Sequence, residues 1–265
     1  MEELIYEVYG SLPRQGPGDD ASTGRALGLM TELPENARIL DVGCGSGAQT
    51  VSLARRTGGT VTALDNHAPF LEALRARAGE AGVANRVRSV VGDMNDLRFD
   101  DGSFDAIWSE GAVYFVGFEK ALREWRRLLT PGGYLAATHV CWLTDRPSNE
   151  IRRYWEVEYP DITDVDTNLK AAEAAGYRVL GTFALPKSAW WDDYYRPLET
   201  SLPGWRERYA HNPGALEFLD YAQHEVEMYR RFSDEYGYVF YVLRSAGTTR
   251  PGSDGSPQSH AMKSR

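Results

Sequence analysis

Between residues 37 and 140, short apolar runs alternate with stretches whose apolar residues recur at helical spacing. The apolar runs predict five strands, at 37–42, 60–65, 86–91, 104–109 and 133–140. The stretches between them predict three helices, at 47–56, 67–81 and 117–129. Strands and helices that alternate in this way indicate an α/β fold with a parallel, doubly wound sheet.

The pattern continues less regularly after residue 140. Its further predicted elements are a helix from Val165 to Ala175, a strand from Tyr177 to Leu185, a helix from Pro213 to Arg231 and a final strand from Tyr236 to Leu243. A stretch rich in aromatic residues, 188–212, lies between them. We expect residues 141–245 to form a substrate cap together with the last two strands. The tail 246–265 is rich in Gly, Ser and Pro and is expected to be disordered.

The N-terminal segment has a different composition from the core. A turn-rich stretch, 12–20, separates a short aromatic helix from a second helix that Ser22 and Thr23 can cap. We expect residues 1–35 to form a cap or lid on a core made of residues 36–140.

The most informative motif is Asp41-Val-Gly-Cys-Gly-Ser-Gly47, which follows the first predicted strand and leads into a helix. Glycines allow positive φ angles and a close approach of the backbone to a ligand. The free N–H groups at the start of the helix can bind polar ligand atoms. The acid before the glycines favours a ligand with an amino group or hydroxyls.

Acidic residues also follow the next strands. Asp65 ends the second strand, Asp93 follows the third, and Glu110 follows the fourth. Open α/β sheets bind ligands at the carboxyl ends of their strands, so these side chains are expected at one edge. A carboxylate at Asp65 can accept both hydroxyls of a ribose, and one at Asp93 can accept the amine of adenine.

The glycines alone do not identify the ligand. Gly43-Cys-Gly-Ser-Gly-Ala48 also satisfies the dinucleotide pattern GxGxxA, so an NAD-dependent oxidoreductase remains an alternative. Asp41, Asp93 and the additional strands at the end of the chain are the features that favour a different cofactor.

Together these motifs resemble those of class I S-adenosylmethionine-dependent methyltransferases, of the type 11 small-molecule kind. The motifs that carry the resemblance are Ile39–Gly47, Ala63-Leu-Asp65, Gly92-Asp-Met94, Phe104–Gly111 and Leu128–Tyr134. Further stretches, 12–18, 110–114 and 190–195, resemble a bacterial subgroup of that family. The resemblance implies a Rossmann-like, seven-stranded sheet of order 3-2-1-4-5-7-6, with strand 7 antiparallel.

The resemblance also implies roles for individual residues. Asp41 and the loop from Gly43 to Gly47 are expected to hold the methionyl end of the cofactor, Asp65 the ribose, and Asp93 with Met94 the adenine. The full set of expected cofactor-binding residues is Asp41, Gly43, Cys44, Gly45, Gly47, Asp65, Asn66, Gly92, Asp93, Met94, Glu110, Arg14 and Gln15.

Other residues are expected to act on the methyl acceptor. Glu110 and His139, each near a strand end, are the candidates for a catalytic base, and Glu110 could instead orient a cationic amine substrate. The residues expected around the acceptor are aromatic: Tyr114, Trp142, Trp190, Trp191, Tyr194 and Tyr195. Cys44 is interpreted as a small spacer in the turn, with a reactive thiol as the alternative.

Composition narrows the classes of partner and cellular setting that the protein can have. The 265 residues carry a formal net charge of −9, which disfavours nucleic acid as a partner. No apolar run is long enough to span a bilayer, and the first residues lack a signal-peptide pattern. Two cysteines, Cys44 and Cys141, without a CxxC partner indicate no metal site or disulfide and fit a reducing, cytoplasmic setting.

We therefore expect an enzyme that methylates a small molecule with S-adenosylmethionine and releases S-adenosylhomocysteine, with a homodimer as its candidate assembly. The sequence does not identify the acceptor atom. A methyltransferase or cofactor-binding module that acts on a protein or another macromolecule remains an alternative.

Overall fold

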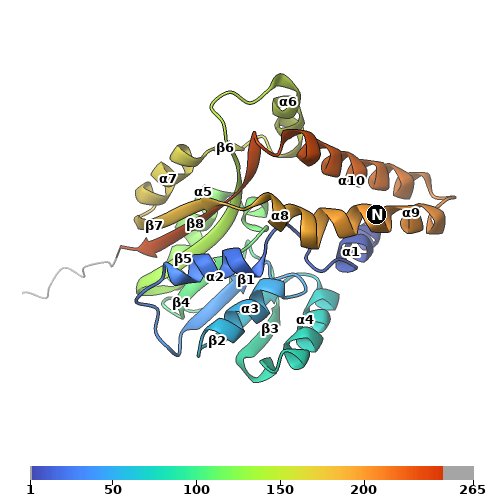
Figure 1. The fold of residues 1–265 in the computed structure, drawn as a ribbon. Helices are drawn as coiled ribbons and strands as arrows, with labels where there is room; N and C mark the ends of the chain where they lie inside the picture. Colours follow the sequence, from blue (N-terminus) through green and yellow to red (C-terminus); the bar gives the residue numbers. More distant parts are fainter. Residues whose placement is uncertain (1, 247–265) are drawn as a thin grey trace, which may run out of the picture.

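The computed structural model describes residues 2–246, and its centre is a mixed sheet (Figure 1). The strands are β1 (Arg38–Val42), β2 (Thr60–Asp65), β3 (Val87–Val91), β4 (Phe104–Ser109), β5 (Leu129–Trp142), β6 (Thr163–Asp164), β7 (Tyr177–Ala184) and β8 (Tyr236–Ser245). Their order is β3-β2-β1-β4-β5-β8-β7, with the short β6 beside β5. β8 runs antiparallel to both of its neighbours, and the other pairings are parallel. This order confirms the expected order 3-2-1-4-5-7-6, because the extra strand β6 raises the numbers of the last two strands by one.

The α-helices are α1 (Glu2–Gly10), α2 (Asp20–Gly28), α3 (Ala48–Arg56), α4 (Ala68–Glu80), α5 (Phe118–Trp125), α6 (Asn149–Glu158), α7 (Val165–Ala174), α8 (Lys187–Trp190), α9 (Arg196–Arg208) and α10 (Pro213–Phe232). Short 3₁₀ turns occur at η1 (Ala84–Arg86), η2 (Val113–Phe115) and η3 (Arg126–Leu128), and a π-helical turn at η4 (Trp191–Tyr195).

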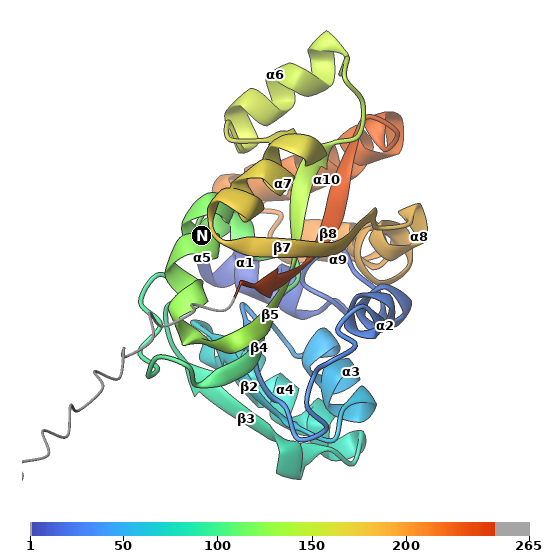
Figure 2. The ribbon, with the colours of Figure 1, turned by 90° about the vertical axis from the view of Figure 1, so that its left-hand side faces the viewer.

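Helices cover both faces of the sheet, as Figure 2 shows. On one face, α2, α3 and α4 pack on an apolar cluster that includes Ile39, Val61 and Leu71. On the other face, α5 and α7 pack on a second cluster that includes Leu40, Ile107 and Leu122. Adjacent strand residues such as Ile39 and Leu40 belong to opposite clusters because side chains alternate along a strand. The two-sided burial explains the almost continuous apolar sequence of β8.

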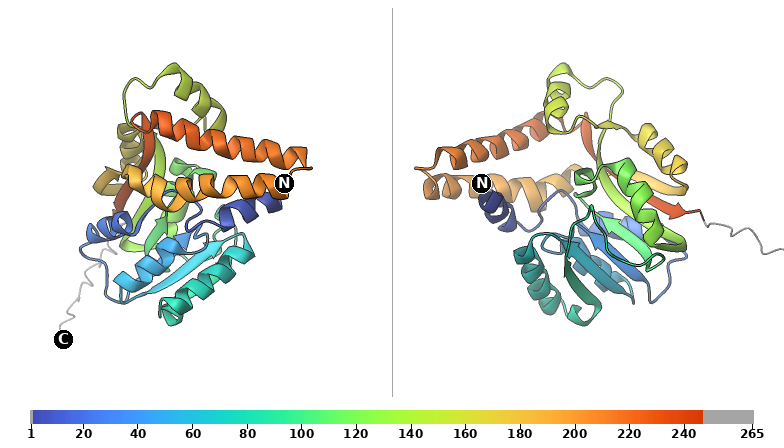
Figure 3. Two further views of the ribbon diagram at one scale, coloured as in Figure 1. Left: turned by 45° about the vertical axis from the view of Figure 1, so that its right-hand side comes forward. Right: turned by 180° about the vertical axis from the view of Figure 1, so that it is seen from behind.

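A helical cap lies beyond the carboxyl ends of the strands. Helices α9 and α10 lie side by side and extend away from the sheet, with α1 next to α9 (Figures 1 and 3). The cap therefore combines the first residues of the chain with segments more than 150 residues later.

Some local predictions were wrong. Helix α2 begins at Asp20, and its N-cap is Asp19, whose carboxylate accepts a hydrogen bond from the Ser22 N–H at 2.6 Å; neither Ser22 nor Thr23 is the cap. Helix α6 was not predicted. The aromatic stretch expected between strand and helix is itself helical from Lys187 to Arg208.

β5 runs past the expected core boundary at residue 140 and ends at Trp142. The tail expected to be disordered lies outside the described residues except for Ala246, whose N–H donates to the Gly176 carbonyl at 2.9 Å. Within the part of the chain that the structure describes, no helix is long and apolar enough to cross a membrane.

Candidate active site

The glycine loop joins β1 to α3 at the carboxyl edge of the sheet. Gly43, Gly45 and Gly47 all have positive φ angles, of 71°, 53° and 84°. A Cβ atom on Gly43 would lie 2.4 Å from the Cβ of Ala112 and 3.0 Å from the Met94 methyl carbon. Gly43 is therefore required both for its backbone angle and for the close approach of the loop after β4.

Gly47 has a different role. A Cβ atom there would lie 2.0 Å from Leu74 on α4, so this glycine allows two helices to approach each other. Gly47 does not line the cavity described below.

Asp65 connects the glycine loop to the end of β2. Its two carboxylate oxygens accept hydrogen bonds from the backbone N–H groups of Gly45 and His67, each at 2.9 Å. These bonds fix the orientation of the carboxylate. A carboxylate has about four lone-pair positions, so capacity for two ligand hydroxyls remains.

The next strand end carries Asp93, which lies near Asn66, Gly92 and Met94 along the same cavity. The N–H of Asn95 donates to the Asp93 carboxylate at 2.8 Å, and this hydrogen bond lowers the carboxyl pKa below its ordinary value. The ionised carboxylate is thus held at the cavity wall, where it can accept a hydrogen bond from a ligand.

The N-terminal segment closes over the glycine loop. The side-chain oxygen of Gln15 accepts the Ser46 N–H at 2.7 Å, and its NH₂ group donates to the Tyr9 and Leu12 carbonyls, each at 3.3 Å. The Tyr6 ring stacks on His67 with centroids 3.7 Å apart. The segment from Ile5 to Pro17 therefore forms part of the cavity wall.

Arg14 and Glu110 form a buried ion pair, with 3.3 Å between nitrogen and oxygen. The other Glu110 oxygen accepts hydrogen bonds from the Thr23 hydroxyl and the Trp108 indole, both at 2.7 Å. Burial raises the pKa of Glu110, while Arg14 and these donors oppose the rise. Because three donors hold this carboxylate, it is suited to anchoring Arg14 rather than to accepting a substrate proton.

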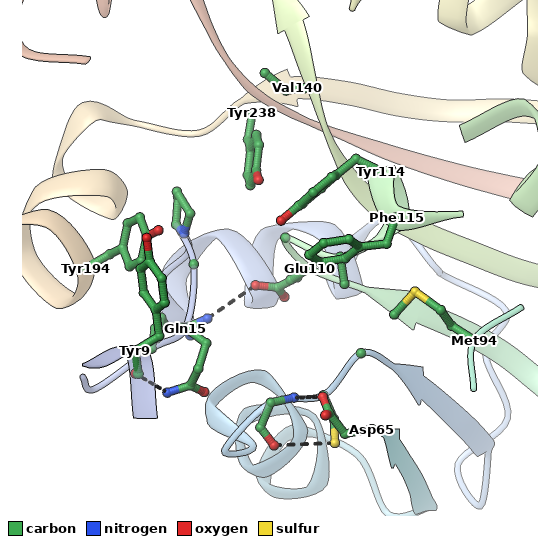
Figure 4. A pocket seen from close by; sticks show the side chains of 18 of the residues that line it. Tyr9, Gln15, Asp65, Met94, Glu110, Tyr114, Phe115, Val140, Tyr194 and Tyr238 are labelled. Atoms are coloured by element: carbon green, nitrogen blue, oxygen red, sulfur yellow. Dashed lines mark hydrogen bonds and ion pairs between the residues drawn. The ribbon is translucent and has the colours of Figure 1, made fainter. Parts of the chain in front are cut away.

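All these elements border one cavity of about 780 Å³. Its walls include most of the expected cofactor residues and four of the expected acceptor residues: Arg14, Gln15, Gly43, Cys44, Gly45, Asp65, Asn66, Gly92, Asp93, Met94, Glu110, Tyr114, Trp190, Tyr194 and Tyr195. In Figure 4, Tyr114 and Tyr238 point their hydroxyl groups into the same open space, with Glu110 facing them.

Five expected site residues do not line this cavity. Besides Gly47, they are Asp41, His139, Trp142 and Trp191. Asp41 is fully buried beneath the glycine loop, where it accepts hydrogen bonds from the Thr50 hydroxyl and the Gln49 amide. Burial raises the pKa of Asp41 to about 7. The structure therefore places this acid as a support for the loop, without a direct path to a ligand.

His139 points to the opposite face of the sheet from the cavity. Its neighbour on β5, Val140, lines the cavity, and alternation along the strand directs His139 toward α5, where it stacks on Phe118 with centroids 4.9 Å apart. Burial lowers the pKa of His139 to about 4. The expectation that His139 faces the pocket was wrong.

The two tryptophans are packing residues. Trp142, at the end of β5, and Trp191, in η4, pack against the cluster on the α2–α4 face. The guanidinium of Arg230 lies 5.1 Å from the centre of the Trp191 ring. For Cys44, burial raises the thiol pKa well above its ordinary value, which disfavours the reactive thiolate and fits a small spacer.

Sequence reasoning missed much of the far half of the cavity. We call this half the aromatic chamber; its residues are Tyr9, Tyr114, Tyr154, Trp155, Tyr159, Trp190, Tyr194, Tyr195, Tyr221, Tyr236 and Tyr238, together with Glu158 and Glu225. They come from α1, η2, α6, the loop after it, the α8–η4 segment, α10 and β8. Among these residues Glu225 had a signal in the sequence. It lies at helical spacing among the apolar residues Ala222, Val226 and Tyr229, which the structure buries on the same side of α10.

The chain is similar to known methyltransferases. A family model described as a methyltransferase domain matches residues 40–137. The chain is 30% identical over 191 residues to the O-methyltransferase resE of Aspergillus sclerotiorum, which covers 67% of this chain and 72% of that protein. It is 28% identical to the 27-O-demethylrifamycin SV methyltransferase of Amycolatopsis mediterranei strain S699, with 91% of this chain and 93% of that protein covered.

A solved structure has the same fold. A SAM-dependent methyltransferase from Geobacter sulfurreducens, in complex with S-adenosyl-L-homocysteine, matches 92% of this chain and 98% of its own chain with a TM-score of 0.79 and 22% identity. With other curated relatives the match spans a smaller part, 37% to 57% of the relative's own length.

Proposed function

Because this chain belongs to the class I S-adenosylmethionine-dependent methyltransferases, we propose that it is an enzyme that transfers a methyl group to a small molecule. The observation that carries the proposal is a single cavity of about 780 Å³ that joins the glycine loop to the aromatic chamber. A cofactor on the loop and an acceptor in the chamber would share one continuous cavity, as direct transfer between them requires.

The residues at the loop end fit the cofactor. The glycine loop leaves room for close backbone contact, the fixed Asp65 carboxylate has lone pairs for two ribose hydroxyls, and Asp93 and Met94 line the part of the cavity where the adenine would bind. Arg14 donates one N–H to Glu110 and one to Asp20, and its remaining N–H groups can bind the cofactor carboxylate. Gln15 and the rest of residues 1–35 then act as the lid over the methionyl end.

The aromatic chamber supports a small acceptor. Its walls come from separate segments of the chain, and several of its rings, including Trp190, Tyr195 and Tyr236, are almost fully buried. Aromatic surfaces bind planar or cationic groups and exclude water from them. The names of two relatives, an O-methyltransferase and a rifamycin methyltransferase, agree with an acceptor of small-molecule size.

The chemistry requires mainly positioning from the protein. S-adenosylmethionine, when bound, supplies a methyl group already activated by its positively charged sulfur. The loop and Asp65 hold one partner while the chamber orients the other, and such alignment supplies a large part of a rate enhancement. The residues of the glycine loop and Asp65 would hold the cofactor, which would give its methyl group to the acceptor atom and keep the electron pair of the carbon–sulfur bond.

The proposal is tested by incubating the protein with S-adenosylmethionine carrying an isotope-labelled methyl group and a mixture of small metabolites. We expect label in a low-mass product, and much less of it with Asp65→Ala protein at a cofactor concentration that just saturates the wild type. NAD serves as the control ligand, because it should neither bind nor compete. Absence of labelled product from chemically diverse mixtures would argue against the proposal.

The same experiment separates the main alternative. If the acceptor is a protein or another macromolecule, label will appear in the high-mass fraction of a cell extract and not in the low-mass fraction.

A further inference from the structure

The aromatic chamber contains a carboxylate that neither the glycine loop nor the cofactor end uses. Glu225 projects from α10 into the cavity and is half-buried there. Its neighbours on the same helix face, Ala222, Val226 and Tyr229, are buried in the apolar core. An acid on the apolar face of a helix is costly unless it has partners, so its position requires an explanation.

Three tyrosines from two distant segments surround this carboxylate. One Glu225 oxygen accepts hydrogen bonds from Tyr195 at 2.9 Å and Tyr194 at 3.3 Å, and the other accepts one from Tyr9 at 3.3 Å. The donors come from η4 and α1, so Glu225 links the N-terminal segment to the cap. These hydroxyls hold the carboxylate in place but bring no positive charge.

The charges around the cavity are unbalanced. Its walls carry five carboxylates, Asp65, Asp93, Glu110, Glu158 and Glu225, and one guanidinium, Arg14. Arg14 is already paired with Glu110. Among residues 2–246, no ion pair includes Glu225. A half-buried carboxylate whose donors are all neutral is stabilised further by a cation, and the described part of the chain places none beside Glu225.

We propose that the methyl acceptor carries a cationic nitrogen, held between Glu225 and the aromatic faces of the chamber. This inference rests on the proposed function, which places the acceptor in the chamber. Tyrosine and tryptophan rings attract cations over their faces, and a nearby carboxylate adds a charge-assisted hydrogen bond. An anionic acceptor would meet the repulsion of Glu225 and Glu158, and a neutral one would leave Glu225 without a counter-charge.

The tyrosine hydroxyls also define the acceptor's orientation. Tyr9, Tyr194 and Tyr195 occupy three of the roughly four lone-pair positions of Glu225, so about one position remains for a further N–H donor. Burial raises the pKa of Glu225 while these hydrogen bonds oppose the rise, and a bound cation would favour the ionised form as well. We therefore assign Glu225 as a specificity-determining residue for an ammonium group.

The test uses two probes of similar shape, phenethylammonium and the neutral 2-phenylethanol, titrated calorimetrically into the protein saturated with S-adenosylhomocysteine. The proteins are the wild type, Glu225→Gln, which removes the charge but keeps an oxygen acceptor, and Glu217→Gln. Glu217 lies exposed on the same helix and provides the matched control. Circular dichroism checks that each variant is folded.

We expect the wild type and Glu217→Gln to bind the ammonium more tightly than the alcohol. Glu225→Gln should bind the ammonium at least roughly tenfold more weakly, with the alcohol unchanged. The inference is overturned if the ammonium shows no binding to the wild type, if both probes bind alike, or if Glu225→Gln keeps the ammonium affinity.

Two further titrations distinguish the proposed function from the cation site. In one, S-adenosylhomocysteine is titrated into the protein; in the other, the ammonium is titrated into protein without S-adenosylhomocysteine. Failure of S-adenosylhomocysteine to bind, with ammonium selectivity intact, would contradict the proposed function and leave a cation site at Glu225.

Discussion

The Arg14 guanidinium lies 3.3 Å from the Glu110 carboxylate, although 96 residues separate the two in the chain. Both side chains are buried, with 7% and 2% of their surfaces exposed. This contact fastens the segment before α2 to the end of β4. The wall that covers the glycine loop is therefore held by a charge interaction that water does not screen.

Arg14→Met should destabilise the protein strongly, because it leaves the Glu110 carboxylate buried without its cation. Removing one partner of a buried pair costs about 3–5 kcal/mol, so we expect a loss of that order in the free energy of unfolding in urea. Adding Glu110→Gln to Arg14→Met should recover part of the loss. Arg123→Met is the control, because Arg123 also lies 3.3 Å from a partner, Glu119, but both are exposed.

An exposed pair contributes at most about 1 kcal/mol, so the control should change stability little. Equal losses for Arg14→Met and Arg123→Met would contradict the assigned role of the buried pair.

Gly43→Ala should distort the glycine loop. The new methyl group would lie 2.4 Å from Ala112, and alanine would have to adopt a φ of 71°. We expect lower thermal stability and at least roughly tenfold weaker binding of S-adenosylhomocysteine, which corresponds to about 1.4 kcal/mol. Gly79→Ala on α4 is the matched control, because a Cβ there meets no atom within 4 Å.

Gly79→Ala should leave binding unchanged and raise stability by up to about 1 kcal/mol, because alanine favours the helix. Normal binding by Gly43→Ala would show that the loop has more freedom than its contacts imply.

Asp41 should make stability depend on pH. Its pKa is about 7 in the folded protein, above the value of about 4 in an unfolded chain. Between these values the folded state holds a proton that the unfolded state releases, so this contribution to stability falls as pH rises from about 4 through 7. Asp41→Asn does not titrate and lacks this contribution.

The melting temperature of the wild type, relative to that of Asp41→Asn, should therefore decrease between pH 5 and pH 8. The comparison uses the difference in melting temperature between the two proteins, because Glu110 and Glu225, whose pKa values burial also raises, are present in both. Parallel melting curves of both proteins across this range would contradict a raised pKa at Asp41.

The sheet and the glycine-loop end of the cavity could be predicted because their signals are local. An apolar run followed by glycines and Asp41 specifies a strand, a turn and a helix in order, and Asp65 and Asp93 lie directly after strands. The chain's connectivity then brings these strand ends together, without any information on tertiary packing.

The direction of a side chain was harder to predict. His139 and Val140 are neighbours on β5, but their side chains point to opposite faces of the sheet. Val140 therefore lines the cavity and His139 does not, and the sequence does not show which face the cavity borders. Asp41 was placed correctly on its strand, but the sequence does not reveal that Thr50 and Gln49 would take up its hydrogen bonds.

The aromatic chamber depends on tertiary packing. Helix α9 was missed because Pro203 lies inside it and weakens the helical pattern. Glu225 faces the cavity only because α10 packs beside η4 and α1, which supply the tyrosines. No local pattern specifies those three partners.

Calorimetric titration of S-adenosylhomocysteine into the wild type and Asp65→Ala tests the central claim most directly. Asp100→Ala, an exposed acid outside the cavity, is the control. We predict one saturable site per chain in the wild type and the control, and roughly 10–100-fold weaker binding in Asp65→Ala, as expected for the loss of about 1.5–3 kcal/mol from hydrogen bonds to a charged group. Folded wild-type protein that releases no heat of binding, or an Asp65→Ala variant that binds as tightly as the wild type, would contradict the account.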